Sequence, residues 1–205
     1  HWGGLDDKHS ACDAGEQQSP INISDLAFDE TLSDLKPDYT LSNVDVVNNG
    51  HTLQANVQEG SSLMVGDERF ELLQFHFHTP SEHYINGTPF PMEVHFVHRS
   101  QSGELAVLGV MFKVGESNPA LDTLWKAAGS DTPVSVSTED LLPQKLNYFR
   151  YDGSLTTPPC SEGVKWHVVP YPVSVSEEQL LAFQGLFPVN ARPIQPKHGR
   201  VVRTK

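Results

Sequence analysis

A period of two in the middle of the chain constrains the fold more than any other sequence feature. Apolar residues there alternate with polar ones or run together, and Gly, Asn and Pro separate the stretches. Two is the period of a β-strand, because successive side chains of a strand point to opposite faces of a sheet. β-Branched and aromatic residues, which favour strands, are frequent in these stretches. The predicted strands are residues 52–58, 69–78, 93–99 and 105–114.

Two other segments are predicted to be helical. Asn118 and Pro119 suit the cap and first turn of a helix over residues 120–128. Ser176-Glu177-Glu178-Gln179 has the form of a capping box before residues 180–187. Strands that follow one another without regular intervening helices favour a mainly β, α+β fold. We expect one large, mostly antiparallel sheet with small peripheral helices.

Composition limits the domain count and the classes of partner. The 205 residues, 38% of them hydrophobic, can bury one compact core, and the 15 Pro and 15 Gly are not collected in a linker. We therefore expect a single domain over residues 1–205. The net charge of −12 repels nucleic acid and anionic membranes. No apolar stretch approaches the roughly 18 residues that span a bilayer, so no membrane span is predicted.

The start of the chain and its cysteines bear on the compartment. His1-Trp2-Gly3-Gly4 lacks a starting Met, and a removed secretory signal or artificial trimming of the chain would explain this. The two cysteines, Cys12 and Cys160, are either free buried thiols or one disulfide. An exported chain favours the disulfide. We expect a periplasmic or extracellular protein.

Closely spaced histidines predict a metal site. In Gln74-Phe75-His76-Phe77-His78 the strand period sends Gln74, His76 and His78 to one face of the sheet. In Glu93-Val94-His95-Phe96-Val97 a neighbouring strand could place His95 beside that pair. Three neutral imidazoles with a fourth position open to water are typical of catalytic Zn²⁺. Gln74 and Glu93 are then predicted to accept hydrogen bonds from the ligands' other ring nitrogens.

Two other interpretations of these histidines remain at this point. They could be separate hydrogen-bonded side chains on a polar face of the sheet. Alternatively, His76-x-His78 followed by Glu82 is similar to the first motif of cupins, which hold iron or manganese. The matching second cupin motif is not found in the sequence.

The order of several motifs resembles that of the α-class carbonic anhydrases, over nearly the whole chain. The motifs run in family order from the N-terminus: His1-Trp2-Gly3, Gln18-Ser19-Pro20-Ile21, Asn48-Asn49-Gly50-His51, Gln74 to His78, Ser81-Glu82-His83, Glu93 to His98, Leu105 to Gly109, Gly153 to Cys160, and Asn190-Ala191-Arg192-Pro193. The resemblance implies a zinc enzyme that interconverts carbon dioxide and bicarbonate and is inhibited by sulfonamides and anions.

The resemblance also carries structural expectations. It implies a twisted, mainly antiparallel sheet with zinc at the bottom of a conical cleft. It implies that Cys12 and Cys160 are paired, as their counterparts are in many exported members. Short loops between the motifs resemble the compact bacterial branch, which is commonly periplasmic and often forms homodimers.

Residue roles follow from the same resemblance. Thr156 is expected to accept a hydrogen bond from the attacking hydroxide while donating one to Glu82. Taken alone, these two residues are a turn threonine and a surface glutamate. The apolar wall that holds carbon dioxide is expected to be formed by residues that, taken alone, would be assigned to the hydrophobic core. Thr157 is expected to lie beside the bicarbonate position. The wall residues are Val97, Val107, Leu155, Val164 and Trp166.

His51 is the expected proton shuttle, because an imidazole titrates near neutral pH. Taken alone, it is a residue at the end of a strand. The sequence departs from many animal members near this residue. Gly4 stands where they carry tyrosine, and Gln54 where they carry asparagine. The efficiency of the relay is therefore left open.

Overall fold

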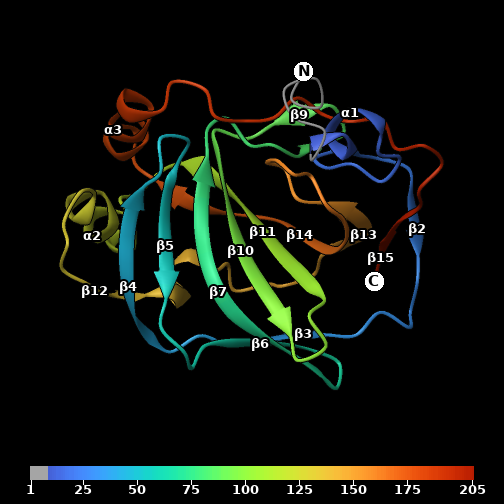
Figure 1. Ribbon diagram of the computed structural model, residues 1–205, viewed down its shortest axis with the longest axis horizontal. Helices are drawn as coiled ribbons and strands as arrows, with labels where there is room; N and C mark the ends of the chain where they lie inside the picture. The colour runs from blue at the N-terminus through green and yellow to red at the C-terminus, as the bar shows by residue number, and fades with distance from the viewer. Residues whose placement is uncertain (1–8) are drawn as a thin grey trace.

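A 12-stranded sheet runs through the part of the chain that the computed structural model describes, residues 9–205 (Figure 1). In spatial order its main path is β12 Val134–Ser137, β4 Leu41–Asn48, β5 Leu53–Val57, β7 Glu68–His78, β10 Met92–Ser100, β11 Leu105–Val114, β14 Glu162–Val175, β13 Phe149–Ser154, β15 Val202–Thr204 and β2 Leu26–Phe28. β6 Ser62–Val65 pairs with β7 and with β3 Leu35–Asp38. β1 Asn22–Ile23, β8 Tyr84–Ile85 and β9 Thr88–Pro89 form a small second sheet.

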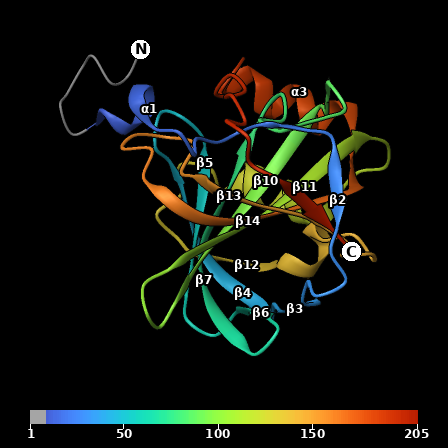
Figure 2. The same ribbon diagram turned by 90° about the vertical axis from the view of Figure 1, so that its right-hand side faces the viewer.

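The four predicted strands are confirmed as β5, β7, β10 and β11, which lie side by side in this order. Their pairing is antiparallel, as expected for the sheet as a whole. Near the centre, however, β11 pairs with β14 in parallel. A parallel partner requires a crossover connection, and residues 115–161 provide it. The pair β15 and β2 is also parallel and brings the last strand of the chain beside an early one (Figure 2).

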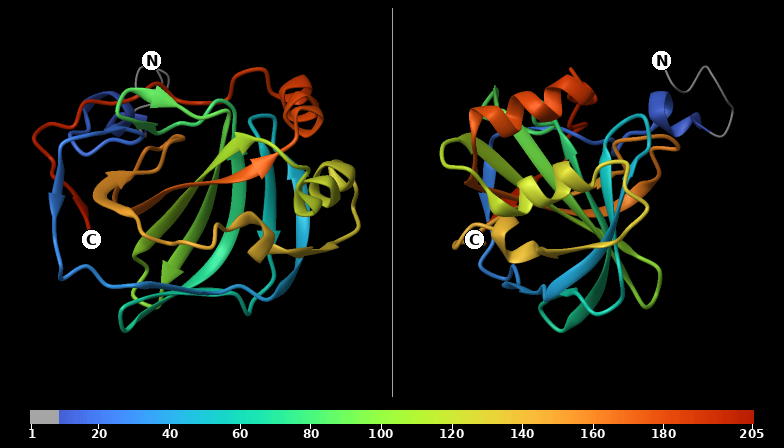
Figure 3. Two further views of the ribbon diagram at one scale, coloured as in Figure 1. Left: turned by 180° about the vertical axis from the view of Figure 1, so that it is seen from behind. Right: turned by 90° about the vertical axis from the view of Figure 1, so that its left-hand side faces the viewer.

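Each face of the sheet carries its own apolar cluster. Phe75, Phe77 and Phe96 are buried on one face, beneath α2 Pro119–Ala127 and α3 Glu177–Leu186. Both helices lie on this side of the sheet (Figure 3). The opposite face carries a second cluster formed by Ile21, Ile23, Val97, Val107, Met111, Tyr151, Val164, Trp166, Val168 and Val202. The alternation along β7 and β10 therefore leaves one face for the helices and the other for the histidines.

The predicted helix caps are confirmed. The Asn118 side chain accepts a hydrogen bond from the Ala120 N–H at 3.0 Å, so α2 begins at Pro119. Ser176 and Gln179 form the reciprocal capping box of α3. Within residues 9–205, two short helical segments were not predicted: α1 Ala11–Ala14 and the 3₁₀ turn Thr138–Leu141. None of the helices within residues 9–205 is long and apolar enough to cross a membrane.

The disulfide between Cys12 and Cys160 is present, as expected. It joins α1 to the loop after β13 across 148 residues of sequence. In the loop-closure model a bridge of this span removes about 5 kcal/mol of unfolded-state entropy, an upper figure because residual structure reduces it. The bridge thus fixes the N-terminal segment against the central sheet.

We expect replacement of Gly153 by Ala to destabilise the fold by about 1–3 kcal/mol, the usual range for overpacking a buried site. An added Cβ would meet the Ser19 hydroxyl and lie 2.7 Å from a Tyr151 ring carbon and 2.9 Å from a Trp166 ring carbon. Gly185 in α3 is the matched control, because nothing lies within 4 Å of its added Cβ. Urea unfolding measures both variants. Equal stability of the two would contradict the packing described for Gly153.

Candidate metal centre

Three histidines meet on the face of the sheet opposite the helices. β7 contributes His76 and His78, and the register of β10 places His95 directly opposite His76. Each offers a nitrogen, and these three atoms lie within 4.8 Å of one another. The ring centroids of His78 and His95 are 4.6 Å apart. The convergence predicted from the strand period is therefore present.

Neighbouring oxygens determine which nitrogen of His76 and His78 is free. His76 Nδ1 lies 2.8 Å from Gln74 Oε1, and His78 Nδ1 lies 2.9 Å from the Asn190 carbonyl oxygen. Both oxygens accept hydrogen bonds, so both Nδ1 atoms must carry the proton. This leaves the two Nε2 atoms as lone-pair donors. His78 Nε2 is buried and has no partner within the described part of the chain.

His95 uses the opposite nitrogen. Its Nε2 lies 2.9 Å from Glu93 Oε1, a close ion-pair contact rather than an aligned hydrogen bond. Burial alone would lower the pKa of His95, but the close contact with the charged Glu93 and the charge of Glu82 together outweigh it and raise this pKa. The carboxylate favours a proton on Nε2, which leaves Nδ1 for a metal. For His76 and His78, burial lowers the pKa, so both remain neutral donors.

A second group, formed by His83, Glu93 and His95, has the same spacing but is a hydrogen-bond network. His83 Nδ1 lies 2.8 Å from Glu93 Oε1, and its Nε2 lies 2.6 Å from the Tyr151 hydroxyl. Burial would raise the pKa of Glu93, but the charges of His83 and His95 outweigh it and hold this pKa well below its usual range. Since both nitrogens of His83 have partners, only the first of these two groups offers three free donors.

Glu82 lies beside the three histidines with one oxygen bonded and one free. Its Oε1 accepts a hydrogen bond from the Arg192 backbone N–H at 2.8 Å. Its Oε2 lies 3.8 Å from His95 Nδ1, is buried, and has no hydrogen-bond partner among residues 9–205. Thr156 lines the same cavity, but the structure shows no hydrogen bond between its hydroxyl and Glu82.

A cavity of about 780 Å³ is lined by His76, His78 and Glu82. Its wall includes His51, Gln54, Gln74, His76, His78, Glu82, Thr156 and Thr157. Leu186, Phe187 and Val189 make part of its lining apolar. A larger hollow of about 1400 Å³ lies near Glu68, Arg69 and Arg99, but none of the predicted site residues lines it. The chemistry therefore belongs to the smaller cavity.

His51 stands at the exposed side of this cavity. The Asn49 side chain accepts hydrogen bonds from the backbone N–H groups of His51 and Thr52, which shapes the turn. Gln54 donates to Asn56 Oδ1 at 2.8 Å, so its amide is held along its own strand. Gly4, the other departure, lies outside the described residues.

The five predicted wall residues lie together. Val97, Val107, Val164 and Trp166 belong to one buried cluster, and Leu155 packs against it. The Trp166 ring centroid lies 4.8 Å from that of His95. Trp166 therefore borders His95 directly, but none of the five residues is among those that line the cavity.

Three further residues support the site and had no predicted role: Asn190, His83 and Tyr151. Asn190 accepts from His78 through its carbonyl, and its side-chain amide donates to the His51 carbonyl oxygen at 2.9 Å. His83 links Glu93 to Tyr151. Asn190 and His83 both belong to motifs of the family order, so their positions were visible in the sequence, but their partners were not.

Comparison with known proteins gives concordant matches. The model of the family described as eukaryotic-type carbonic anhydrase matches residues 1–205. A carbonic anhydrase of Pectobacterium carotovorum is 44% identical over 98% of this chain and 85% of its own length. The α-carbonic anhydrase of Thermovibrio ammonificans, solved with the inhibitor sulfanilamide, superimposes with a TM-score of 0.93 at 43% identity, covering 99% of this chain and 93% of that one. The Photobacterium profundum α-carbonic anhydrase superimposes with a TM-score of 0.90 at 44% identity, covering 99% of this chain and 94% of that one.

Proposed function

The chain belongs to the eukaryotic-type, or α-class, carbonic anhydrase family and is an enzyme of that family; we propose that it hydrates carbon dioxide reversibly at a zinc ion held by His76, His78 and His95. The observation that carries the proposal is the convergence of three imidazole nitrogens beside a buried oxygen of Glu82 that has no hydrogen-bond partner among residues 9–205. Family membership sets aside the cupin interpretation. All three histidines are present. This argues against a non-catalytic family member, a zinc-binding or interaction module that has lost its ligand histidines.

The donor set fits zinc. Three neutral imidazoles leave the charge of the cation undiminished, and three protein ligands leave a fourth position open. When bound, zinc supplies hydroxide near neutral pH by lowering the pKa of a coordinated water to about 7, a value already established for carbonic anhydrases themselves. Gln74, Glu93 and the Asn190 carbonyl oxygen hold the three rings in orientation.

Thr156 and Glu82 orient the nucleophile. We assign to the Thr156 hydroxyl the role of donor to Glu82 Oε2, the buried oxygen that lacks a partner among the described residues. A hydroxyl has a single proton to donate, so once that proton is directed to Glu82 its oxygen can only accept a hydrogen bond from any other group. It therefore accepts from the nucleophile and directs the nucleophile's own lone pair at the substrate carbon.

Carbon dioxide is apolar and requires a dry surface. The cluster of Val97, Val107, Leu155, Val164 and Trp166 offers one next to His95. Thr157 lines the cavity, and we assign to it the contact with the bicarbonate product. The overall reaction consumes one water and one carbon dioxide and yields bicarbonate and one proton, which must leave the cavity.

His51 carries that proton to solvent. Its place on the exposed side of the cavity lets a ring nitrogen accept a proton from cavity water and release it outside. Replacement by Ala should lower steady-state turnover severalfold. Exchange of ¹⁸O between carbon dioxide and bicarbonate at chemical equilibrium should hardly change, because it needs no proton release. Small imidazole buffers should restore part of the turnover.

His198→Asn is the control for this prediction. His198 is exposed, lies outside the cavity wall and has a φ of 48°, a conformation that Asn tolerates better than Ala does. Turnover of this variant should equal that of the unmodified enzyme. If His51→Ala slowed equilibrium exchange as much as turnover, or if imidazole gave no rescue, another group would move the proton.

Two further properties are proposed from the family and the disulfide. Aromatic sulfonamides should inhibit, since the Thermovibrio ammonificans relative was solved with sulfanilamide. Export to the periplasm or beyond the cell is supported by the disulfide, which persists in oxidising compartments. The homodimer and anion inhibition implied by the resemblance stay predictions.

One experiment tests the proposed function as a whole. Metal analysis of the purified protein should give one zinc per chain, and stopped-flow measurement should show carbon dioxide hydration. Removal of the metal by a chelator should abolish activity, and zinc should restore it. Iron in place of zinc, or an inactive zinc-loaded protein, would refute the proposal.

A further inference from the structure

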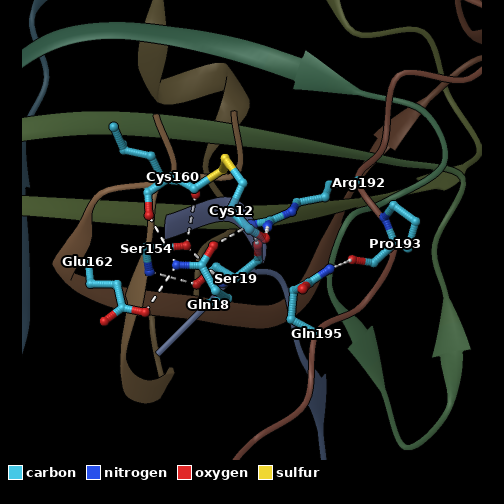
Figure 4. The surroundings of a disulfide bond; sticks show 10 residues. Cys12, Gln18, Ser19, Ser154, Cys160, Glu162, Arg192, Pro193 and Gln195 are labelled. Atoms are coloured by element: carbon cyan, nitrogen blue, oxygen red, sulfur yellow. Dashed lines mark hydrogen bonds between the residues drawn. A yellow bond between two sulfur atoms is a disulfide. The ribbon is translucent and has the colours of Figure 1, made fainter. Parts of the chain in front are cut away.

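The loop that carries Thr156 and Thr157 is held at both ends by two consecutive residues of the N-terminal region, Gln18 and Ser19 (Figure 4). Before the loop, Ser19 N–H donates to Ser154 Oγ at 2.9 Å, and Ser154 N–H donates to Ser19 Oγ at 3.0 Å. This exchange ties two distant segments by a reciprocal pair of hydrogen bonds.

After the loop, Gln18 provides the second attachment. Its Nε2 donates to the Cys160 carbonyl oxygen at 3.0 Å. Cys160 has a φ of 55°, a left-handed conformation that costs energy for any residue with a side chain. Its backbone N–H in turn donates to the Thr157 carbonyl oxygen at 2.9 Å. The surroundings of Cys160, Gln18 among them, must therefore hold this end of the loop in place.

The same dipeptide is tied to Glu82 through Arg192. The guanidinium donates from Nη1 to Gln18 Oε1 at 2.9 Å and to the Ser19 carbonyl oxygen at 2.8 Å. The backbone N–H of Arg192 donates to Glu82 Oε1. A continuous set of hydrogen bonds therefore runs from the Glu82 carboxylate to both ends of the Thr156 loop.

Burial makes these bonds expensive to break. Gln18 is 2% exposed, and Ser19, Ser154 and Cys160 are fully buried. Water cannot replace a lost partner there, so a broken bond leaves an unsatisfied polar group or forces the loop to move. The disulfide joins the same regions covalently, and Arg192 Nη2 also donates to the Cys12 carbonyl oxygen at 2.8 Å.

We propose that Gln18 and Ser19 are positioning residues that hold the Thr156 hydroxyl in register with Glu82 Oε2. The proposal rests on the function proposed above, because it concerns the geometry of that pair. Gln18 suits the role chemically, since one amide accepts from Arg192 and donates to Cys160 at the same time. A carboxylate in its place could only accept hydrogen bonds. A methionine could not donate a hydrogen bond and would accept one only weakly.

The test replaces Gln18 by Met, which keeps the length of the side chain and removes its hydrogen bonds with Cys160, Glu162 and Arg192. We expect the kcat/KM of carbon dioxide hydration and the rate of equilibrium ¹⁸O exchange to fall about 10-fold to 100-fold, as a small displacement of a catalytic group does. The affinity for sulfanilamide should fall as well, because its bound nitrogen would donate to Thr156. Zinc content should stay at one per chain.

Gln17→Met is the matched control, because Gln17 is the exposed neighbour and only its backbone N–H forms a hydrogen bond in the described structure. It should match the unmodified enzyme in every assay. Should Gln18→Met fail to fold, Gln18→Glu keeps the volume and the acceptor for Arg192 while losing the donor to Cys160, and should show the same losses.

Two outcomes are decisive. Lower thermal stability with unchanged exchange rate and sulfanilamide affinity in the folded, zinc-loaded variant would show that Gln18 only stabilises the fold, and would overturn the proposal. An unmodified enzyme without hydration activity would instead refute the proposed function. The two failures are therefore distinguishable in the same set of measurements.

Discussion

His76→Ala and His95→Ala should each lose zinc and with it carbon dioxide hydration, down to the uncatalysed rate, while most of the fold remains. Each change leaves two imidazoles of the group, too few for a catalytic zinc site. His76 is half-buried at the cavity wall, so its removal opens little of the core. Metal analysis and stopped-flow hydration measure the two losses, and circular dichroism checks the fold.

His83 provides a control that separates the two histidine groups. His83 belongs only to the group with Glu93 and His95, whereas His76 belongs only to the other. His83→Gln keeps polar atoms for Glu93 and Tyr151 and should retain one zinc per chain. Zinc retained by His76→Ala but lost from His83→Gln would show that the metal binds to the group with Glu93 instead.

Thr156→Ala should lower kcat/KM about 100-fold or more, the usual cost of removing a positioned hydrogen-bonding group from a reaction centre. The variant keeps all three histidines, so its zinc content should not change. Its affinity for aromatic sulfonamides should fall in parallel, because their nitrogen would donate to the missing hydroxyl. Thr156→Ser, which retains the hydroxyl, should recover most of both properties.

Glu82→Gln tests the other half of this pair. With Oε1 still accepting from the Arg192 N–H, the new NH₂ group would occupy the place of Oε2 and could only donate. Thr156 would then have no acceptor, and activity should fall as in Thr156→Ala. Full activity in either variant would mean that the nucleophile is oriented by something other than this pair.

Local sequence pattern determined the elements that hold the metal site. A strand period of two, with phenylalanine between the histidines, predicts that His76 and His78 share a face whatever surrounds them. The same pattern around His95 predicts the third ligand, since neighbouring strands of one sheet bring equivalent faces together. The caps at Asn118 and Ser176 were also predictable, because each depends on residues only two or three positions away.

Family resemblance extended the prediction to residues that local pattern leaves undecided. Local pattern alone predicts a turn residue at Thr156 and a surface residue at Glu82, and neither has a periodicity that marks it; in the structure Glu82 is buried. The disulfide was expected for the same reason, and the structure contains it. The roles of Thr156, Glu82 and His51 remain to be measured.

Only the tertiary structure decided the partners that orient the site, because they come from remote parts of the chain. The oxygen that fixes the tautomer of His78 belongs to Asn190, 112 residues away. Ser19 meets Ser154 across 135 residues, and Arg192 meets Gln18 across 174. A local pattern reports which face of a strand a side chain takes. It holds no information on which distant backbone carbonyl or amide will lie beside that side chain, since that depends on the order of strands in the folded sheet.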